Sequence, residues 1–177
     1  MDLELWKKCV AFHGHECPGL AIGYRAALIA QEALGLPLLP ATDEEVVCVT
    51  ENDACGVDAV QVITGCTMGK GNLLYKPTGK MAFSFFLRKG GKRVRIVMKP
   101  QAWPEISREE LQRYLLEVPA EDAFFIKEPT FDVPEQTRLF ANQVCDVCGE
   151  AAPEHKTRLQ AGQKVCLDCF HDYTRGW

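Results

Sequence analysis

The feature that most constrains this chain is a pair of Cys-x-x-Cys motifs near its C-terminal end. Cys145 and Cys148 form the first pair, Cys166 and Cys169 the second, and seventeen residues separate the pairs. Each motif brings two sulfurs together, and two motifs complete the tetrahedral four-thiolate shell of a structural zinc ion. Because about 35 residues bury too little apolar surface to fold unaided, the metal supplies the free energy of folding. A redox dithiol is disfavoured, since the two pairs are spaced for one ion.

The zinc motif predicts two domains. Pro129 and Pro134 mark a connector, so we expect a core domain over residues 1–140 and a four-cysteine zinc-finger domain over 141–177. A short helix predicted over 170–177 favours a treble-clef zinc finger. From residue 145 onwards, four cations face five acids, which is a poor match for a phosphate backbone and disfavours a nucleic-acid partner. We therefore favour a protein-docking or dimer-supporting role for the finger.

The core domain contains segments of both secondary-structure types. We expect helices over 2–12, 18–34, 56–64 and 107–118, and strands over 46–50 and 124–131. Pro18 suits the first position of the second helix, and Ser107 with Glu110 forms a capping box for the last. Because strands and helices do not alternate strictly, the predicted fold class is α+β. The core is layered, with packed helices on an antiparallel-rich sheet.

The best-defined strands form a β-hairpin over residues 81–99. A two-residue turn at Gly90 and Gly91 is expected, because both glycines accept the positive φ that such turns require. The cross-strand pairs expected on the apolar face are Leu87–Val94, Phe85–Ile96 and Phe83–Met98. The same register opposes Arg88 to Arg93, and like charges opposed on a sheet are a weak indication of an anion between them.

Composition bounds the class of protein. Hydrophobic residues make up 47% and charged residues 25% of the 177 residues, as in folded globular proteins. No apolar run approaches the ~20 residues of a membrane helix, and the N-terminus lacks a signal-peptide pattern. We therefore expect a cytoplasmic protein with no membrane association. Its nine cysteines are then thiols, metal ligands or catalytic groups rather than a disulfide framework.

The net charge of −4 conceals a cationic segment. Residues 59–104 contain no Asp or Glu and carry nine cations, namely Lys70, Lys76, Lys80, Arg88, Lys89, Lys92, Arg93, Arg95 and Lys99. Such a concentration favours an anionic small molecule over a general attraction to nucleic acid or membrane. Lys70, in the glycine-rich loop over 65–72, is the residue expected to bind that anion. A solvated hairpin is the alternative.

The stretch FHGHECPG, residues 12–19, is the first candidate site of the core domain. In an extended segment alternate residues point the same way, so His13, His15 and Cys17 share one face and can surround one ion. Cys17 is also the expected N-cap of the helix that begins at Pro18, where the helix dipole favours a thiolate. Alternatively, Cys17 only caps the helix and the histidines bond backbone carbonyls.

Two further cysteines favour a site over a cap. Cys55 stands directly before the expected helix over 56–64, and Cys66 follows its end, each beside a glycine. If the helix N-termini bearing Cys17 and Cys55 converge on one cleft, their sulfur and imidazole donors suit a second transition metal. Zn, Ni or Fe is expected there rather than Mg or Ca.

Two long segments carry a resemblance to a known family. FHGHECPGLAIGYRAAL and ENDACGVDAVQVITGCTMGKGNL, together with the C-terminal cysteine pairs, resemble the E-subunit proteins associated with formylmethanofuran dehydrogenase. The resemblance implies a homodimeric α+β core, an auxiliary treble-clef zinc finger and dehydrogenase subunits as partners. It also implies a link to anaerobic one-carbon metabolism and methanogenesis, in which a molybdenum or tungsten pterin interconverts CO2 and formylmethanofuran. By position, it implies that His13, His15, Cys17, Cys55 and Cys66 are the core-site residues.

The first functional hypothesis is therefore a metal-binding protein that serves this oxidoreductase in an accessory role. Cys17 and Cys55 are then metal-ligating or nucleophilic thiolates, and His15 or His13 is a further ligand or proton carrier. The first alternative is a non-catalytic zinc-finger adaptor that binds a protein, or less readily a nucleic acid. The second is a thiol-redox protein that uses Cys17 with Cys55 or Cys66. Whether the chain itself is an enzyme is left open.

Overall fold

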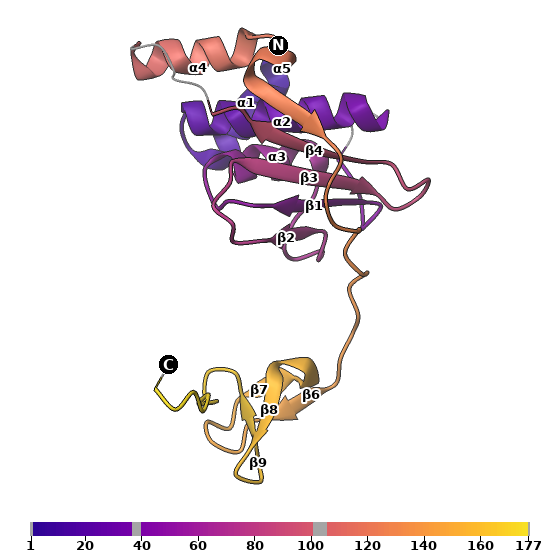
Figure 1. Ribbon diagram of the computed structural model, residues 1–177, viewed down its shortest axis with the longest axis vertical. Coiled ribbons are helices and arrows are strands. Elements are labelled where there is room, and N and C mark those ends of the chain that lie inside the picture. The colour runs from indigo at the N-terminus through magenta and orange to yellow at the C-terminus, as the bar shows by residue number, and fades with distance from the viewer. Residues whose placement is uncertain (1, 37–39, 101–105, 177) are drawn as a thin grey trace. The chain divides into compact units, whose positions relative to one another are not determined.

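The computed structural model describes residues 2–36, 40–100 and 106–176. The chain divides into two compact units, Met1–Thr137 and Arg138–Trp177, and each is considered by itself. The first unit contains a five-stranded sheet with its helices, and the second contains two small two-stranded sheets (Figure 1). None of the helices described is long and apolar enough to cross a bilayer.

The first unit has the α+β architecture that the sequence predicts. Its helices are α1 (Leu3–His13), α2 (Pro18–Leu34), α3 (Gly56–Thr64), α4 (Arg108–Glu117) and α5 (Ala120–Ala123). Its strands are β1 (Val46–Thr50), β2 (Leu73–Tyr75), β3 (Ala82–Leu87), β4 (Arg93–Met98) and β5 (Phe124–Lys127). The last strand ends at Lys127 rather than at the expected residue 131. Pro129, which lacks an N–H, cannot extend the ladder.

The sheet has the strand order β2-β1-β3-β4-β5, in which only β1 and β2 run parallel. Helices α1, α2 and α3 lie on one face of this sheet (Figure 1). Buried side chains of α2, among them Leu20 and Tyr24, share one apolar core with Phe83, Phe85 and other residues of the strands and helices. On the opposite face, Val47, Val49 and Phe86 form a second, smaller cluster against which Phe131 packs.

The register of the hairpin differs from the predicted one. Phe83 pairs with Ile96 and Phe85 with Val94, so the register is shifted by two residues. The connection is a four-residue loop, residues 88–91, closed by the N–H of Leu87 donating to the Lys92 carbonyl at 2.8 Å. A shift of two residues leaves every side chain on its predicted face, because the pleat repeats every two residues. Apolar patterning therefore could not distinguish the two registers.

The predicted opposition of two arginines is also wrong. Arg93 lies opposite Phe86, and its guanidinium pairs with the Glu128 carboxylate at 3.0 Å. Arg88 pairs with the Glu44 carboxylate at 3.0 Å and donates to the Pro134 carbonyl at 2.8 Å. Because both guanidinium groups have protein acceptors, these two arginines give no indication of an anion between them.

The second unit folds into two short hairpins. Its strands are β6 (Asn142–Val144), β7 (Ala151–Pro153), β8 (Thr157–Gln160) and β9 (Gln163–Cys166), with a 3-10 turn η1 (Glu154–Lys156) between β7 and β8. The helix predicted over 170–177 is absent from residues 170–176. There the N–H of His171 donates to the Gln160 side chain and that of Gly176 to the Thr174 hydroxyl, instead of to carbonyls one helical turn back.

Candidate functional site

The second unit brings all four of its cysteines together. The sulfurs of Cys145, Cys148, Cys166 and Cys169 lie within 4.8 Å of one another, and those of Cys148 and Cys166 are 4.0 Å apart. Zinc bound tetrahedrally at about 2.3 Å requires sulfurs roughly 3.8 Å apart, so this donor set fits zinc. N–H groups of Cys148 and Cys166 lower the pKa of Cys145 to about 6, which favours the ligating thiolate. Four protein ligands close the shell, as in a structural site.

The first unit holds a second group of metal-ligating atoms. One ligand atom from each of His13, His15 and Cys17 lies within 4.8 Å of the others, and His13 Nε2 is 3.8 Å from Cys17 Sγ. The sequence predicted this grouping from an extended segment, but His13 is the last residue of α1. Gly14 follows with a left-handed φ of 92°, so the grouping arises where one helix ends and the next begins.

The first turn of α2 fixes the thiol of this group. Cys17 is the N-cap of α2, as expected, and its sulfur accepts the N–H of Leu20 at 3.3 Å. Its side chain is 1% exposed, whereas His13 is half-buried and His15 is exposed. The group therefore presents a buried sulfur at one end and an imidazole accessible to solvent at the other.

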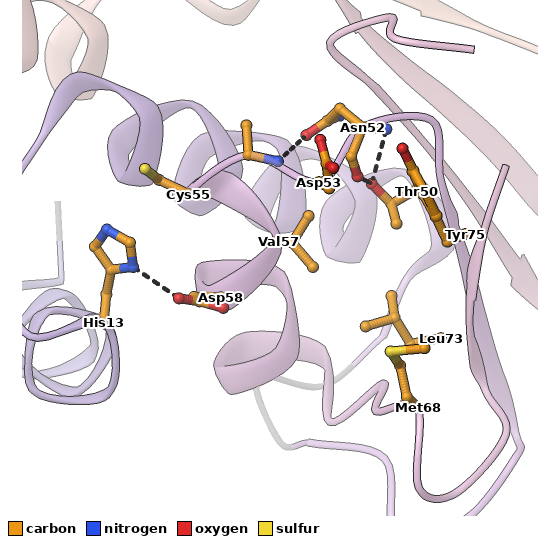
Figure 2. Close-up of a pocket in the computed structure, with 11 residues that line it drawn as sticks. His13, Thr50, Asn52, Asp53, Cys55, Val57, Asp58, Met68, Leu73 and Tyr75 are labelled. Atoms are coloured by element: carbon orange, nitrogen blue, oxygen red, sulfur yellow. Dashed lines mark hydrogen bonds and ion pairs between the residues drawn. The ribbon is translucent and has the colours of Figure 1, made fainter. Parts of the chain in front are cut away.

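Asp58 orients His13 and was not predicted as a site residue. Its carboxylate Oδ2 lies 2.7 Å from His13 Nδ1, a contact drawn in Figure 2. The other ring nitrogen, Nε2, lies 3.8 Å from Cys17 Sγ. A carboxylate that holds one nitrogen of a histidine leaves the other free as a ligand, which is common around protein metals. Asp58 lies on α3, three positions after Cys55. Because residues three apart on a helix are neighbours on its surface, this spacing could have identified Asp58 from the sequence.

Cys55 lies beside Cys17. Burial raises the pKa of the Cys55 thiol, and the neighbouring Cys17 thiol raises it further. A β-carbon placed on Gly19 would lie 3.5 Å from the sulfur of Cys55 and 3.9 Å from that of Cys17. Unlike Cys17, Cys55 caps no N–H of its helix, and its thiol is hydrogen-bonded with that of Cys17.

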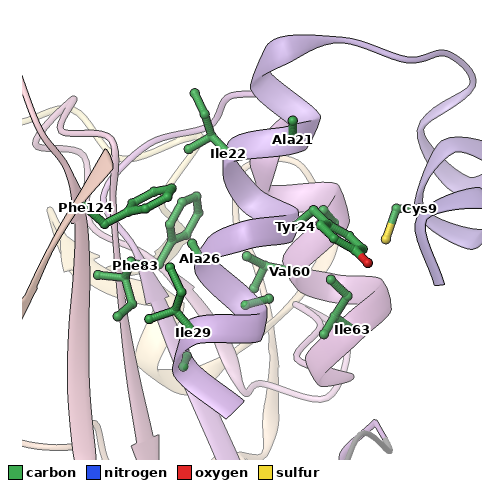
Figure 3. Packing of buried hydrophobic residues seen from close by; sticks show 14 of the residues in the cluster. Cys9, Ala21, Ile22, Tyr24, Ala26, Ile29, Val60, Ile63, Phe83 and Phe124 are labelled. Atoms are coloured by element: carbon green, nitrogen blue, oxygen red, sulfur yellow. The ribbon is translucent and has the colours of Figure 1, made fainter. Parts of the chain in front are cut away.

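Two glycines allow the helices that carry Cys17 and Cys55 to meet. A β-carbon on Gly23 of α2 would lie 1.9 Å from the Gly56 carbonyl oxygen of α3, so no larger residue fits. Figure 3 shows Tyr24 of α2 close to Val60 and Ile63 of α3, with which it shares the apolar core. Backbone contact at these glycines brings the N-terminal ends of the two helices together, as expected from the sequence.

Buried polar residues hold the loop that precedes Cys55. The Asn52 side chain accepts the N–H of Ala54 at 3.2 Å and donates to the Lys80 carbonyl at 3.1 Å. The neighbouring Glu51, 3% exposed, accepts a 2.6 Å hydrogen bond from Arg95. Burial raises the pKa of Glu51, but the bonds from Arg95 and a threonine outweigh it and lower the pKa overall. The position of Cys55 is therefore fixed from the sheet side as well as by α3.

A cavity of about 400 Å³ adjoins this group. It is lined by His13, Thr50, Asn52, Asp53, Ala54, Cys55, Val57, Asp58, Met68, Leu73 and Tyr75. In Figure 2, His13 and Cys55 lie on one side, Met68, Leu73 and Tyr75 on the other, and Asp53, Val57 and Asp58 between them. Ligand cavities typically measure about 300–1,000 Å³, so this volume suits a small organic molecule.

The structure places Cys66 and Lys70 away from the group. Cys66 lies beyond the other end of α3 from Cys55, and nine helical residues span about 13 Å. Its thiol donates to the Val46 carbonyl, and burial raises its pKa to about 11, so it is a poor metal ligand where it lies. The ammonium of Lys70 donates to the Ala41 carbonyl at 2.8 Å, and Lys70 does not line the cavity.

An α+β unit with a His/Cys group at its helix termini and a four-cysteine unit fitted to zinc define a metal-binding protein. Residues 12–129 match a protein family described as "FmdE, Molybdenum formylmethanofuran dehydrogenase operon". Residues 138–175 match the "Prokaryotic dksA/traR C4-type zinc finger". The first match covers well over half of the chain, and the chain belongs to the FmdE family. The resemblance and the C-terminal zinc finger predicted from the sequence are thereby confirmed.

Two similar proteins extend this assignment. The crystal structure of a tungsten formylmethanofuran dehydrogenase E-subunit (FmdE)-like protein from Syntrophus aciditrophicus matches with a TM-score of 0.68 and 26% identity. That match covers 94% of this chain and 90% of the other. A "Probable S-adenosyl-L-methionine-binding protein" from Archaeoglobus fulgidus is 31% identical over 192 positions, which cover 92% of this chain. The chain spans about half, 51%, of that relative.

Proposed function

We propose that the group of His13, His15, Cys17 and Cys55, hereafter the core cluster, binds a transition metal and is the functional centre of the protein. The carrying observation is that ligand atoms of His13, His15 and Cys17 lie within 4.8 Å of one another, with the Cys55 thiol beside Cys17. Two imidazoles and two thiols suit zinc, nickel or iron. A bound metal of this kind supplies a Lewis acid, or for nickel and iron a redox centre.

The residues of the core cluster have different roles in this proposal. Cys17 is buried and anchored by the Leu20 N–H, so it is the permanent ligand. Asp58 holds His13 with Nε2 towards the cluster. His15 is exposed and therefore the donor that a substrate can most easily replace or use for proton transfer. Cys55 lines the cavity and connects the cluster to any molecule bound there.

We further propose that this centre serves anaerobic one-carbon chemistry as a homodimeric, cytoplasmic accessory partner of formylmethanofuran dehydrogenase-type subunits. The name of the family supports the association, as does the name of the similar solved structure. Co-purification of tagged chain with dehydrogenase subunits from its own cells tests the partnership. Sedimentation equilibrium tests the dimer.

The decisive experiment counts metal per chain in protein purified without oxygen. The expected result is two metals in the parent and one in Cys17→Ser, with the loss confined to the core cluster. Cys66→Ser is the matched control, because this thiol lies outside the core cluster and should leave two metals bound. Full metal content in Cys17→Ser, or a single metal in a parent protein reconstituted with zinc, nickel and iron in turn, would refute the core site.

A second candidate function is binding of a sulfonium metabolite. The Archaeoglobus fulgidus relative is named a probable S-adenosyl-L-methionine-binding protein. The observation in this chain that favours such a ligand is the cavity of about 400 Å³ beside the core cluster. Titration of the chain with S-adenosyl-L-methionine by calorimetry tests it, with saturable binding to one site per chain as the expected result.

The zinc finger supports the adaptor function considered for this chain. Val147, Leu159 and Leu167 are 60%, 75% and 44% exposed, so the small unit presents aliphatic side chains to solvent. These side chains are the apolar contacts that the finger would offer to a protein partner. A chain truncated after Thr137 should retain core metal and lose its protein partner. Retention of the partner would exclude the finger as the docking element.

A further inference from the structure

We infer that the cavity beside the core cluster binds an organic cation with an apolar body, and that Asp53 and Tyr75 select this charge. The inference deepens the proposed function and rests on it in one respect, since the core cluster forms one end of the same cavity. It assigns a class of ligand that the family name does not give. It also opposes the anionic ligand that the sequence suggested.

The charged residues of the cavity have one sign. Within the described parts of the chain, two aspartates and no lysine or arginine line it. Asp58 already holds His13 and accepts from Gln61 at 3.3 Å. Asp53 is exposed, and within the same described parts its carboxylate has neither a hydrogen bond nor an ion pair. A carboxylate that faces a cavity without a cation of its own is suited to a cationic ligand.

The rest of the cavity wall is apolar and aromatic. Val57, which is half-buried, and Leu73, which is buried, form part of this wall. Met68 and Tyr75 also line the cavity and are 73% and 49% exposed. The ring of a tyrosine attracts a cation over its face, and methionine adapts its shape to bound ligands. No described lysine or arginine lies over the Tyr75 ring. The ring is therefore available to a ligand.

Binding of a metal ion at the core cluster leaves the charge of the cavity negative. A divalent metal with the two thiolates of Cys17 and Cys55 has no net charge, so Asp53 and Asp58 still make this region acidic. Lys70, the cation expected to attract an anion, is bound to the Ala41 carbonyl and is absent from the cavity wall. An anionic ligand would therefore meet a carboxylate with no counter-ion beside it.

The test compares probes that differ in charge and little else. S-adenosyl-L-methionine carries a sulfonium where S-adenosyl-L-homocysteine has a neutral thioether, and the cation should bind about tenfold more tightly. Benzyltrimethylammonium should likewise bind more tightly than phenylmethanesulfonate, an anion of similar size. Calorimetry on the full chain with its metals bound measures all four. Equal affinities within both pairs, or no saturable binding of either cation, would overturn the inference.

Variants assign the selectivity to residues. Asp53→Asn should weaken binding of the cations about tenfold, leave the neutral probe unchanged and strengthen binding of the anionic probe. Tyr75→Leu should also weaken binding of the cations. Asp43→Asn removes an exposed carboxylate that does not line the cavity, and it should change nothing. Unchanged selectivity in Asp53→Asn would contradict the assignment.

Metal content of the same samples separates this inference from the proposed function. Asp53→Asn should keep two metals, because Asp53 has no bond to the core cluster. A parent with no core metal that still selects cations would refute the metal site and leave the cavity assignment standing. A parent protein that binds the core metal but does not discriminate between the probes by charge would refute the cavity assignment and leave the metal site standing. Binding of benzyltrimethylammonium without S-adenosyl-L-methionine would refute only the sulfonium candidate.

Discussion

The four-cysteine group of the zinc finger and the core cluster of the first unit are built in opposite ways. In the finger, four cysteines in two short motifs converge in a unit whose strands have only three or four residues each. In the core, the residues of the core cluster come from the end of α1, the loop between α1 and α2, the N-cap of α2 and the residue before α3. A buried apolar core holds these helices in place. We therefore expect the finger to depend on bound metal for its folding, and the core cluster to depend on the folded unit around it.

The largest predicted difference between the two units is in how far each unfolds when its cysteine ligands are replaced. Cys145→Ser combined with Cys148→Ser should unfold residues 138–176 and release one metal, because zinc binding supplies about 10 kcal/mol or more of folding free energy in such units. The first unit should keep its structure. Amide spectra by NMR, resolved residue by residue, together with metal analysis, measure both effects.

The matched variant for this prediction is Cys17→Ser. It should release the core metal while both units stay folded, since the apolar core of the first unit does not depend on the ion. A finger that keeps dispersed amide signals without its zinc would break the comparison at once. So would a first unit that unfolds with Cys17→Ser.

The next prediction concerns the contact that brings the helices of the core together. Gly23→Ala places a β-carbon 1.9 Å from the Gly56 carbonyl oxygen, a backbone atom that cannot move aside cheaply. We expect a loss of about 3 kcal/mol of unfolding free energy, at the upper end of overpacking effects. Gly69→Ala, with no atom within 4 Å of its β-carbon, is the control. Urea denaturation of both variants measures the difference, and equal midpoints would refute the close contact.

A smaller effect is expected from the carboxylate that orients His13. Asp58→Ala should reduce core metal affinity about 10- to 100-fold, as removal of such carboxylates commonly does. The finger should keep its zinc affinity, because Asp58 belongs to the first unit and the candidate ligands of the finger are four cysteines. Competition with a chelator measures both sites in one sample. Asp53→Asn is the control, and an equal loss in that variant would mean that charge alone, rather than orientation, sets the affinity.

Much of this architecture could be predicted because its signals are local. The cysteine pairs 145/148 and 166/169, the Pro18 helix start and the Ser107 capping box each lie within a few consecutive residues. The bounds of α2, β1 and α3 were therefore correct. The main wrong local predictions, the hairpin register and the helix over 170–177, were cases in which several backbone arrangements satisfied the same pattern.

The core cluster could be predicted only in part, because its geometry depends on tertiary contacts. His13, His15 and Cys17 are close in sequence and were grouped correctly, although for the wrong local conformation. Asp58 was missed, since its role depends on how α3 packs against α1. Cys66 had the same flanking glycine signal as Cys55, yet it lies beyond the opposite end of α3.

The smallest predicted effect on stability is that of Gly19→Ala, which should nevertheless change the geometry of the core cluster. A β-carbon on Gly19 would lie 3.1 Å from the Cys55 β-carbon, so Cys55 must move by a few tenths of an ångström in Gly19→Ala. The higher helix propensity of alanine, about 0.5–1 kcal/mol, offsets this strain, and the free energy of unfolding should change by less than about 1 kcal/mol. The absorption spectrum of cobalt bound at the core cluster should nevertheless shift, because one thiolate is displaced. An unchanged core spectrum would place Cys55 outside the metal shell, while the finger spectrum serves as the internal reference.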